Sequence, residues 1–153
     1  MSADAKLAEL NLELPEAPKP GGNYVPVVEI DNMAYVSGHG PVLPDGSMIT
    51  GRVGADLTEE QGTQAARQVG LTILASLRHN LGSLDRVERV VKVFGMVNAA
   101  ADFGSHPNVI NGFSDLMVEV FGEQGRGARS AVGMGSLPGN IAVEIEVILK
   151  LKS

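Results

Sequence analysis

The sequence predicts an α+β fold in which two helices cover one face of a β-sheet. Two long segments, 59–81 and 107–121, carry apolar residues at helical spacing. Five shorter segments are rich in valine and isoleucine or alternate between apolar and polar residues, which is typical of strands. The resulting order is β-β-α-β-α-β-β, which favours helices packed on one side of a sheet. The other face, with its small residues, is then available for burial in an oligomer.

The composition is that of one globular domain. The chain has 153 residues, of which 44% are hydrophobic and 20% are charged, so extended disorder is excluded. The lack of cysteine excludes disulfides, thiolate metal sites and cysteine nucleophiles. A formal net charge of −6 disfavours nucleic acid as a partner. No signal peptide and no apolar run of about 18 residues is visible, so we expect a cytoplasmic protein without a membrane partner.

Residues 1–22 are interpreted as a lead-in to a single domain over 23–153. Regularly spaced leucines predict a short amphipathic helix over 5–12. Three prolines and the pair Gly21-Gly22 then end it.

The first two strands are expected at 24–30 and 33–37. Asp31-Asn32 between them has the chemistry of a hairpin turn. A loop rich in glycine and proline is expected over 38–54.

The long helix over 59–81 has defined ends. Thr58 and Gln61 form a capping box, in which each side chain bonds the other residue's backbone N–H, and Gly82 suits the position just past the helix. A valine-rich segment over 89–97 then predicts a buried strand.

The second helix is expected to begin near Pro107, because proline suits the first helical position, and to end before Gly122. The last two strands are predicted over 129–134 and 141–149. A proline–glycine turn at 137–140 separates them and predicts a second hairpin.

The strongest candidates for chemistry are Arg129, at the start of one predicted strand, and Glu144, in the next. Apolar and acidic residues alternate around Glu144, so Glu144 and Glu146 share one face of their strand. Across a hairpin, Arg129 would lie near this face. Its guanidinium could then bind a substrate carboxylate while a glutamate orients water or moves a proton. The alternative for all three residues is a solvated surface charge.

Other candidate constellations are weaker. His39, His79 and His106 are far apart and lack metal-ligand spacing, so no metal site is predicted. Ser37 precedes Gly38 at a strand end without the sequence of a nucleophile elbow, which indicates tight packing.

Taken together, the sequence resembles the RidA family, also called YjgF-like or L-PSP proteins, and within it the longer subgroup labelled as endoribonucleases. The match extends over 24–150. The motifs that carry it are Ala128-Arg129-Ser130, Leu137-Pro138, Val143-Glu144-Ile145-Glu146, Tyr35-Val36-Ser37-Gly38, Arg89-Val90-Val91-Lys92-Val93, Gln61, Asp102-Phe103 and Asn111.

The resemblance implies a chorismate-mutase-like mixed sheet and a homotrimer with three clefts between subunits. It also implies hydrolysis of 2-imino acids and enamines, such as 2-iminopropionate and 2-aminoacrylate, to 2-keto acids and ammonia, with no cofactor. By resemblance, Arg129 grips the substrate carboxylate, Glu144 holds or activates the attacking water, and the backbone at Arg129 and Ala131 binds the imine end. The remaining cleft positions match Tyr24, Ser37 and Asn111, with Tyr24 supplied by the neighbouring subunit.

Three departures from the family pattern bear on the substrate. Ala131 stands where many members carry cysteine, His39 replaces a common glutamine, and the segment 104–108 is longer than in the short members. Two other functions therefore stay open. One is a non-catalytic module that binds small carboxylic acids in the same cleft, and the other is an endoribonuclease or translation inhibitor. The acidic charge, few aromatic residues and unpaired histidines count against RNA.

Overall fold

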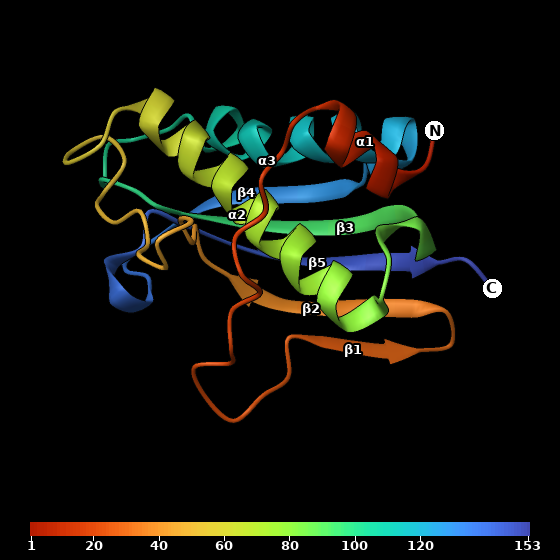
Figure 1. The fold of residues 1–153 in the computed structure, drawn as a ribbon. Helices are drawn as coiled ribbons and strands as arrows, with labels where there is room; N and C mark the ends of the chain where they lie inside the picture. Colours follow the sequence, from red (N-terminus) through yellow and green to blue (C-terminus); the bar gives the residue numbers. More distant parts are fainter.

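The computed structural model describes residues 1–153 and contains a five-stranded mixed sheet in the order β1-β2-β5-β3-β4 (Figure 1). The strands are β1 (Val27–Ile30), β2 (Met33–His39), β3 (Val87–Asn98), β4 (Ala128–Met134) and β5 (Val143–Leu151). The helices are α1 (Ala3–Glu9), α2 (Glu59–Leu81) and α3 (His106–Phe121), with short 3-10 turns η1 (Leu84–Arg86), η2 (Gly122–Gly125) and η3 (Pro138–Asn140). The α+β class and the mixed sheet are confirmed.

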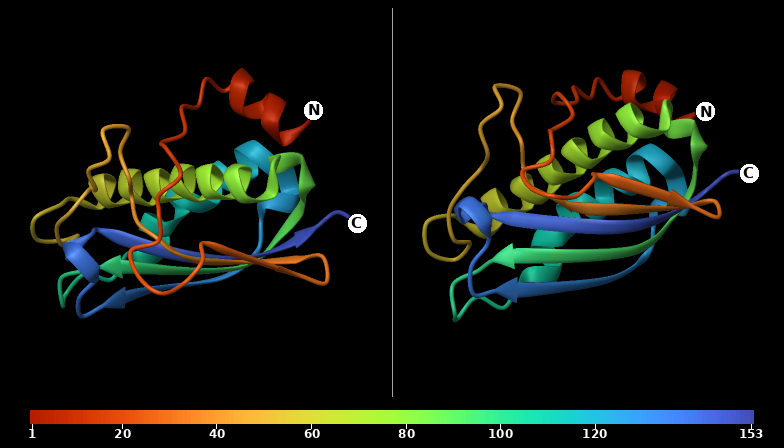
Figure 2. Two further views of the ribbon diagram at one scale, coloured as in Figure 1. Left: turned by 60° about the horizontal axis from the view of Figure 1, so that its bottom comes forward. Right: turned by 90° about the horizontal axis from the view of Figure 1, so that it is seen from below.

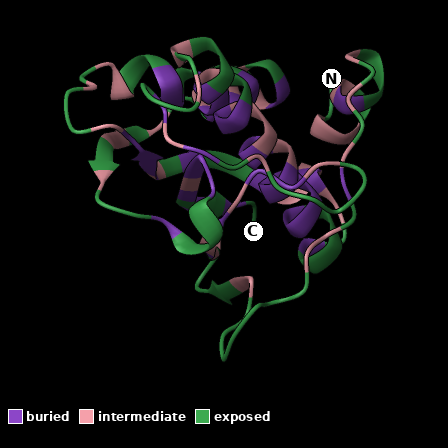
Figure 3. Cartoon of the chain, turned by 90° about the vertical axis from the view of Figure 1, so that its left-hand side faces the viewer, coloured by how far each residue is buried: buried purple, intermediate pink, exposed green.

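The long helices α2 and α3 lie side by side on one face of the sheet, and the other face carries no helix (Figure 2). The buried residues gather between these helices and the sheet (Figure 3). Along β5 the burial alternates, so that Val143, Ile145 and Val147 face the helices and the residues between them face the open side. This alternation places Glu144 on the open face. No helix is long and apolar enough to span a bilayer.

The ends of α2 follow the local sequence. The Thr58 side chain accepts from the backbone of Gln61 at 3.1 Å, and the Gln61 side chain accepts from the backbone of Thr58 at 2.9 Å. Gly82 ends the helix with φ at 85°, a left-handed conformation that glycine adopts without strain. The predicted capping box and helix end are confirmed.

The N-terminal helix begins and ends earlier than predicted. Ser2 caps it by accepting from the backbone of Ala5, and Asn11 adopts a positive φ of 53° just beyond it. The lead-in that follows crosses α2 and reaches the edge of the sheet at β1 (Figure 1). The first strand begins at Val27 rather than at Tyr24, so Tyr24 lies in the bend before it.

The predicted second hairpin is wrong. β4 pairs in parallel with β3, and β5 is inserted between β3 and β2, antiparallel to both. Parallel strands need a long crossover, and α3 between β3 and β4 supplies it. The turn at Pro138–Asn140 therefore leads past the end of β3 instead of folding β5 back on β4.

Candidate functional site

A pocket of about 550 Å³ lies between the lead-in, the end of β2 and the start of β5. Its lining combines four lead-in residues, at positions 18–21, and two residues just before β1 with the end of β2, the segment after it and Glu144 on β5. The Glu144 carboxylate lies against the backbone of Gly38, where an added Cβ would stand 2.5 Å from the Glu144 Oε2 atom. Glycine at position 38 therefore leaves room for this carboxylate in the pocket wall.

The environment of Glu144 makes its carboxylate bind a proton more readily than an ordinary glutamate does. Burial raises the pKa of the Glu144 carboxyl above its usual range, and the negative charge of Glu146 on the same face adds to the effect. A raised pKa makes the carboxylate a stronger base toward a water or a substrate than an ordinary glutamate is.

Ser37 connects β2 to the segment before β1 through two hydrogen bonds. Its hydroxyl donates to the Val25 carbonyl at 2.7 Å, and its backbone N–H donates to the Pro26 carbonyl at 2.9 Å. Both acceptors directly follow Tyr24, whose hydroxyl accepts from the backbone of Gly21 at 3.2 Å. Ser37 and Tyr24 thus line the same pocket as Glu144 within one chain. The resemblance implied that Tyr24 comes from the neighbouring subunit, whereas here it lines the pocket of its own copy.

His39 also lines the pocket, and the sequence did not reveal its contacts. The ring is only 6% exposed, and burial lowers its pKa below the ordinary value of 6.5. Its Nδ1 lies 2.6 Å from the Ser37 carbonyl oxygen, and its Nε2 lies 2.8 Å from the hydroxyl of Ser76 on α2. Ser76 is a polar residue at a buried, otherwise apolar position of α2. A buried hydroxyl needs a hydrogen-bond partner, and this is the one feature of the sequence that could have suggested a contact with His39.

Arg129 lies on the other face of the sheet. Register places Arg129 beside Val93, whose side chain faces the helices. The guanidinium donates from Nη1 to the Ser114 hydroxyl and from Nη2 to the Pro107 carbonyl, each at 3.1 Å, and both acceptors belong to α3. It forms no ion pair. The expectation that Arg129 and Glu144 converge across a hairpin is therefore wrong for a single copy of the chain.

Asn111 and Ala131 lie on the same side of the sheet as Arg129. Ala131 is two residues further along β4 and faces the same side. Asn111 is exposed on α3, and its spacing of four residues from Pro107 and three from Ser114 places it on the helix surface that Arg129 contacts. The predicted site residues thus form two groups, one around Glu144 and one around Arg129.

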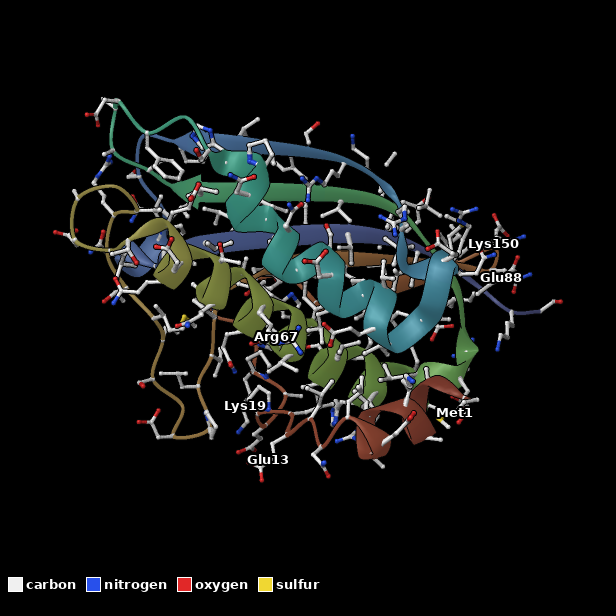
Figure 4. All side chains as sticks on the ribbon, turned by 90° about the horizontal axis from the view of Figure 1, so that it is seen from above. Met1, Glu13, Lys19, Arg67, Glu88 and Lys150 are labelled. Atoms are coloured by element: carbon white, nitrogen blue, oxygen red, sulfur yellow. The ribbon has the colours of Figure 1, made fainter.

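Lys19 is the one lysine or arginine among the pocket-lining residues, and it lies on the lead-in beside α2 (Figure 4). The structure contains no group of three or more histidine, aspartate or glutamate side chains placed to hold a metal ion. The pocket therefore offers one carboxyl group, two hydroxyl groups and backbone, with few positive charges.

The chain is similar to known proteins over nearly its whole length. The sequence matches the family described as "YjgF/chorismate_mutase-like, putative endoribonuclease" over residues 4–149. Protein TCP17 of Trypanosoma cruzi is 42% identical over 150 residues, which are 97% of this chain and 94% of that protein. The Agrobacterium tumefaciens protein Atu1372, of unknown function, superposes with a TM-score of 0.89 at 39% identity and covers 98% of this chain and 94% of its own.

Two further structures superpose on this chain to different degrees. A crystal structure described as a putative endoribonuclease from Shewanella oneidensis superposes with a TM-score of 0.94 at 31% identity, covering 99% of this chain and all of its own. RidA from an Antarctic Psychrobacter reaches a TM-score of 0.62 at 28% identity, covering 90% of this chain and 96% of its own. The expected resemblance, longer subgroup included, is confirmed, and the chain belongs to the YjgF/chorismate-mutase-like family.

Proposed function

We propose that the protein is an imine deaminase that hydrolyses small 2-imino acids and their enamine tautomers to 2-keto acids and ammonia. The observation that carries this proposal is the half-buried Glu144 carboxyl with a raised pKa, held against Gly38 inside a pocket. A relative from Dermatophagoides farinae named 2-iminobutanoate/2-iminopropanoate deaminase supports it. That protein is 30% identical over 142 residues, which are 92% of this chain and 95% of its own.

The chemistry needs a carboxylate, a water and an oriented imine. A protonated imine carbon is electrophilic, so water adds to it while Glu144 accepts a proton from that water, and a carbinolamine forms. Glu144 then passes this proton to the nitrogen. The C–N bond breaks and ammonia leaves, while the hydroxyl oxygen becomes the carbonyl of the keto acid and gives its proton to Glu144. Transfer of that proton to the ammonia, which departs as ammonium, restores the carboxylate. Orientation in the pocket lowers the barrier without a cofactor.

The Arg129 guanidinium takes the substrate carboxylate in this proposal. Its contacts to Ser114 and Pro107 use two N–H donors and leave others for a planar, bidentate grip. In this proposal Asn111 on α3 and the backbone at Ala131 on β4 complete the part of the cleft that Arg129 provides.

A site with both halves needs two copies of the chain, because Glu144 and Arg129 lie on opposite faces of the sheet. We therefore include in the proposal a homotrimer whose clefts join the Glu144 side of one copy to the Arg129 side of the next. The open sheet face supports it, since Val28, Tyr35 and Val132 are exposed there or along its edges.

The test compares wild type with Arg129→Ala for keto-acid formation from freshly generated 2-aminoacrylate. We expect turnover to fall by roughly thirtyfold or more, because losing a charged contact in a buried cleft costs about 2 kcal/mol or more. Arg126→Ala is the matched control, since Arg126 is exposed and pairs only with Glu123. Arg129→Lys, which keeps the charge but loses the fork, should give an intermediate rate.

Oligomeric mass and thermal unfolding are measured for each variant, because Arg129 also contacts α3. Wild type without turnover above the buffer reaction would refute the deaminase. Carboxylate binding that depends on Arg129 would then identify the non-catalytic binding module. RNA cleavage with a steep salt dependence would identify the nuclease of the family description instead.

A further inference from the structure

We infer that His39 is a positioning residue that connects α2 to the pocket wall and holds Ser37, Gly38 and Tyr24 in place around Glu144. The inference rests on the proposed function for its catalytic consequence, but its structural part stands on the geometry alone. His39 borders the pocket, but it is almost fully buried and both of its ring nitrogens already contact protein groups, so we assign it a positioning role and no contact with the substrate.

A continuous path of hydrogen bonds joins the helix layer to the pocket. Ser76 on α2 contacts the His39 Nε2 atom, and the His39 Nδ1 atom contacts the Ser37 carbonyl. The Ser37 hydroxyl and backbone N–H then hold the carbonyls of Val25 and Pro26. This path ends at the residue next to Tyr24, which forms the outer wall of the pocket.

The acceptors decide the direction of each hydrogen bond. A carbonyl oxygen only accepts, so the Nδ1 atom of His39 carries the proton and donates to Ser37. The neutral ring then has a lone pair on Nε2, and the Ser76 hydroxyl donates to it. Burial, which lowers the pKa of His39, keeps the ring neutral and so preserves this tautomer.

The location of His39 explains why the path matters for Glu144. The pairing of β2 with β5 shifts register between Val36 and His39, so Ser37 and Gly38 lie in an irregular segment without a regular ladder partner. Gly38 is also the residue against which the Glu144 carboxylate lies. His39 therefore fixes a segment that the sheet does not hold by itself.

Nitrogen-15 NMR of the histidine rings tests the structural part. We expect His39 to be the Nδ1–H tautomer at neutral pH, and Ser76→Ala to move the resonance of its Nε2 atom. Thr63→Ala, which removes a hydroxyl from the same helix far from His39, should leave that resonance unchanged. An Nε2–H tautomer, or a His39 ring that averages like the exposed His79, would overturn the inference.

Tyrosine fluorescence tests the pocket wall without reference to activity. Tyr24 and Tyr35 are the two tyrosines and there is no tryptophan, so Tyr35→Phe leaves Tyr24 as the single fluorophore. In that background, His39→Leu should lower the fluorescence anisotropy of Tyr24. His39→Asn should restore it, because the asparagine amide nitrogen occupies the place of Nδ1 and can donate to Ser37. Equal anisotropy in all three proteins would contradict the positioning role.

Kinetics then test the catalytic consequence. We expect His39→Leu to lower kcat by roughly ten- to a hundredfold through misplacement of the wall, with KM within about twofold of wild type. His39→Asn should recover most of kcat. Failure of the Asn variant to exceed the Leu variant, in folded proteins, would reject His39 as a positioning residue. An inactive wild type would reject the proposed function and leave the NMR and fluorescence results to decide the structural part.

Discussion

Two effects, burial and a neighbouring negative charge, raise the pKa of the Glu144 carboxyl. The pocket removes part of its water, and Glu146, two residues away on the same face of β5, adds a second negative charge. Burial is the larger cause, and both raise the pKa of Glu144. In the proposed reaction the carboxylate accepts a proton, so the rate should fall as pH drops through this raised pKa, above the ordinary value of 4.5.

At this scale we predict that Glu146→Gln lowers the pKa of Glu144, because the charge repulsion is removed while the burial remains. Carbon-13 NMR of the Glu144 side chain measures the shift directly. The acid limb of kcat/KM should move to lower pH by the same amount.

Glu88→Gln is the matched control for this prediction. Glu88 pairs with Lys150 (Figure 4), which lies near the end of β5, whereas Glu144 lies near the start of that strand. Its replacement should leave the pKa of Glu144 unchanged. A Glu144 pKa that is equally unmoved by Glu146→Gln would assign the whole effect to burial.

Among the elements, the contact between α2 and α3 depends on glycine. A Cβ on Gly112 would overlap the backbone oxygen of Thr63 on the neighbouring helix, and backbone cannot move aside as a flexible side chain can. This close approach also sets where α3 presents Pro107 and Ser114 to Arg129.

We therefore predict that Gly112→Ala lowers the free energy of unfolding by about 3 kcal/mol, as overpacked cores do. Chemical denaturation followed by circular dichroism measures it. Gly104→Ala is the control, since a Cβ there meets no atom within 4 Å, and it should change stability by less than about 0.5 kcal/mol. Equal stability of the two variants would show that α2 and α3 can separate without cost.

For the whole molecule, the division of the site between two faces predicts complementation. Arg129→Ala keeps the Glu144 half of each cleft, and Glu144→Gln keeps the Arg129 half. If the halves come from different copies, refolding the two inactive variants together in equal amounts should restore about one quarter of wild-type activity, because each cleft draws its halves independently.

The matched control mixes Arg129→Ala with the Arg129→Ala/Glu144→Gln double variant, which supplies no intact Arg129. That mixture should stay inactive. Mixed oligomers, verified with two affinity tags, that recover no activity in the first experiment would show that the clefts are not shared between copies.

Local sequence was a reliable guide to the elements. The capping box at Thr58, the glycine at position 82 and the hairpin turn at Asp31-Asn32 each act within a few residues, so their chemistry is readable from spacing. The family motifs also pointed to Tyr24, Ser37 and Glu144 as cleft residues, but they assigned Tyr24 to the neighbouring subunit, whereas it lines the pocket of its own chain.

Long-range pairing was decided only in the tertiary structure. A proline–glycine turn between two strand-like segments is compatible with a hairpin, and the sequence by itself favoured one. The α3 crossover instead aligned β4 parallel to β3, which turned Arg129 toward the helices and away from Glu144. Likewise, the residues around His39 do not predict its contact with Ser76, because Ser76 is 37 positions away in the sequence. Turns and caps are set by neighbours along the chain, whereas strand partners and buried polar contacts depend on how the whole core packs.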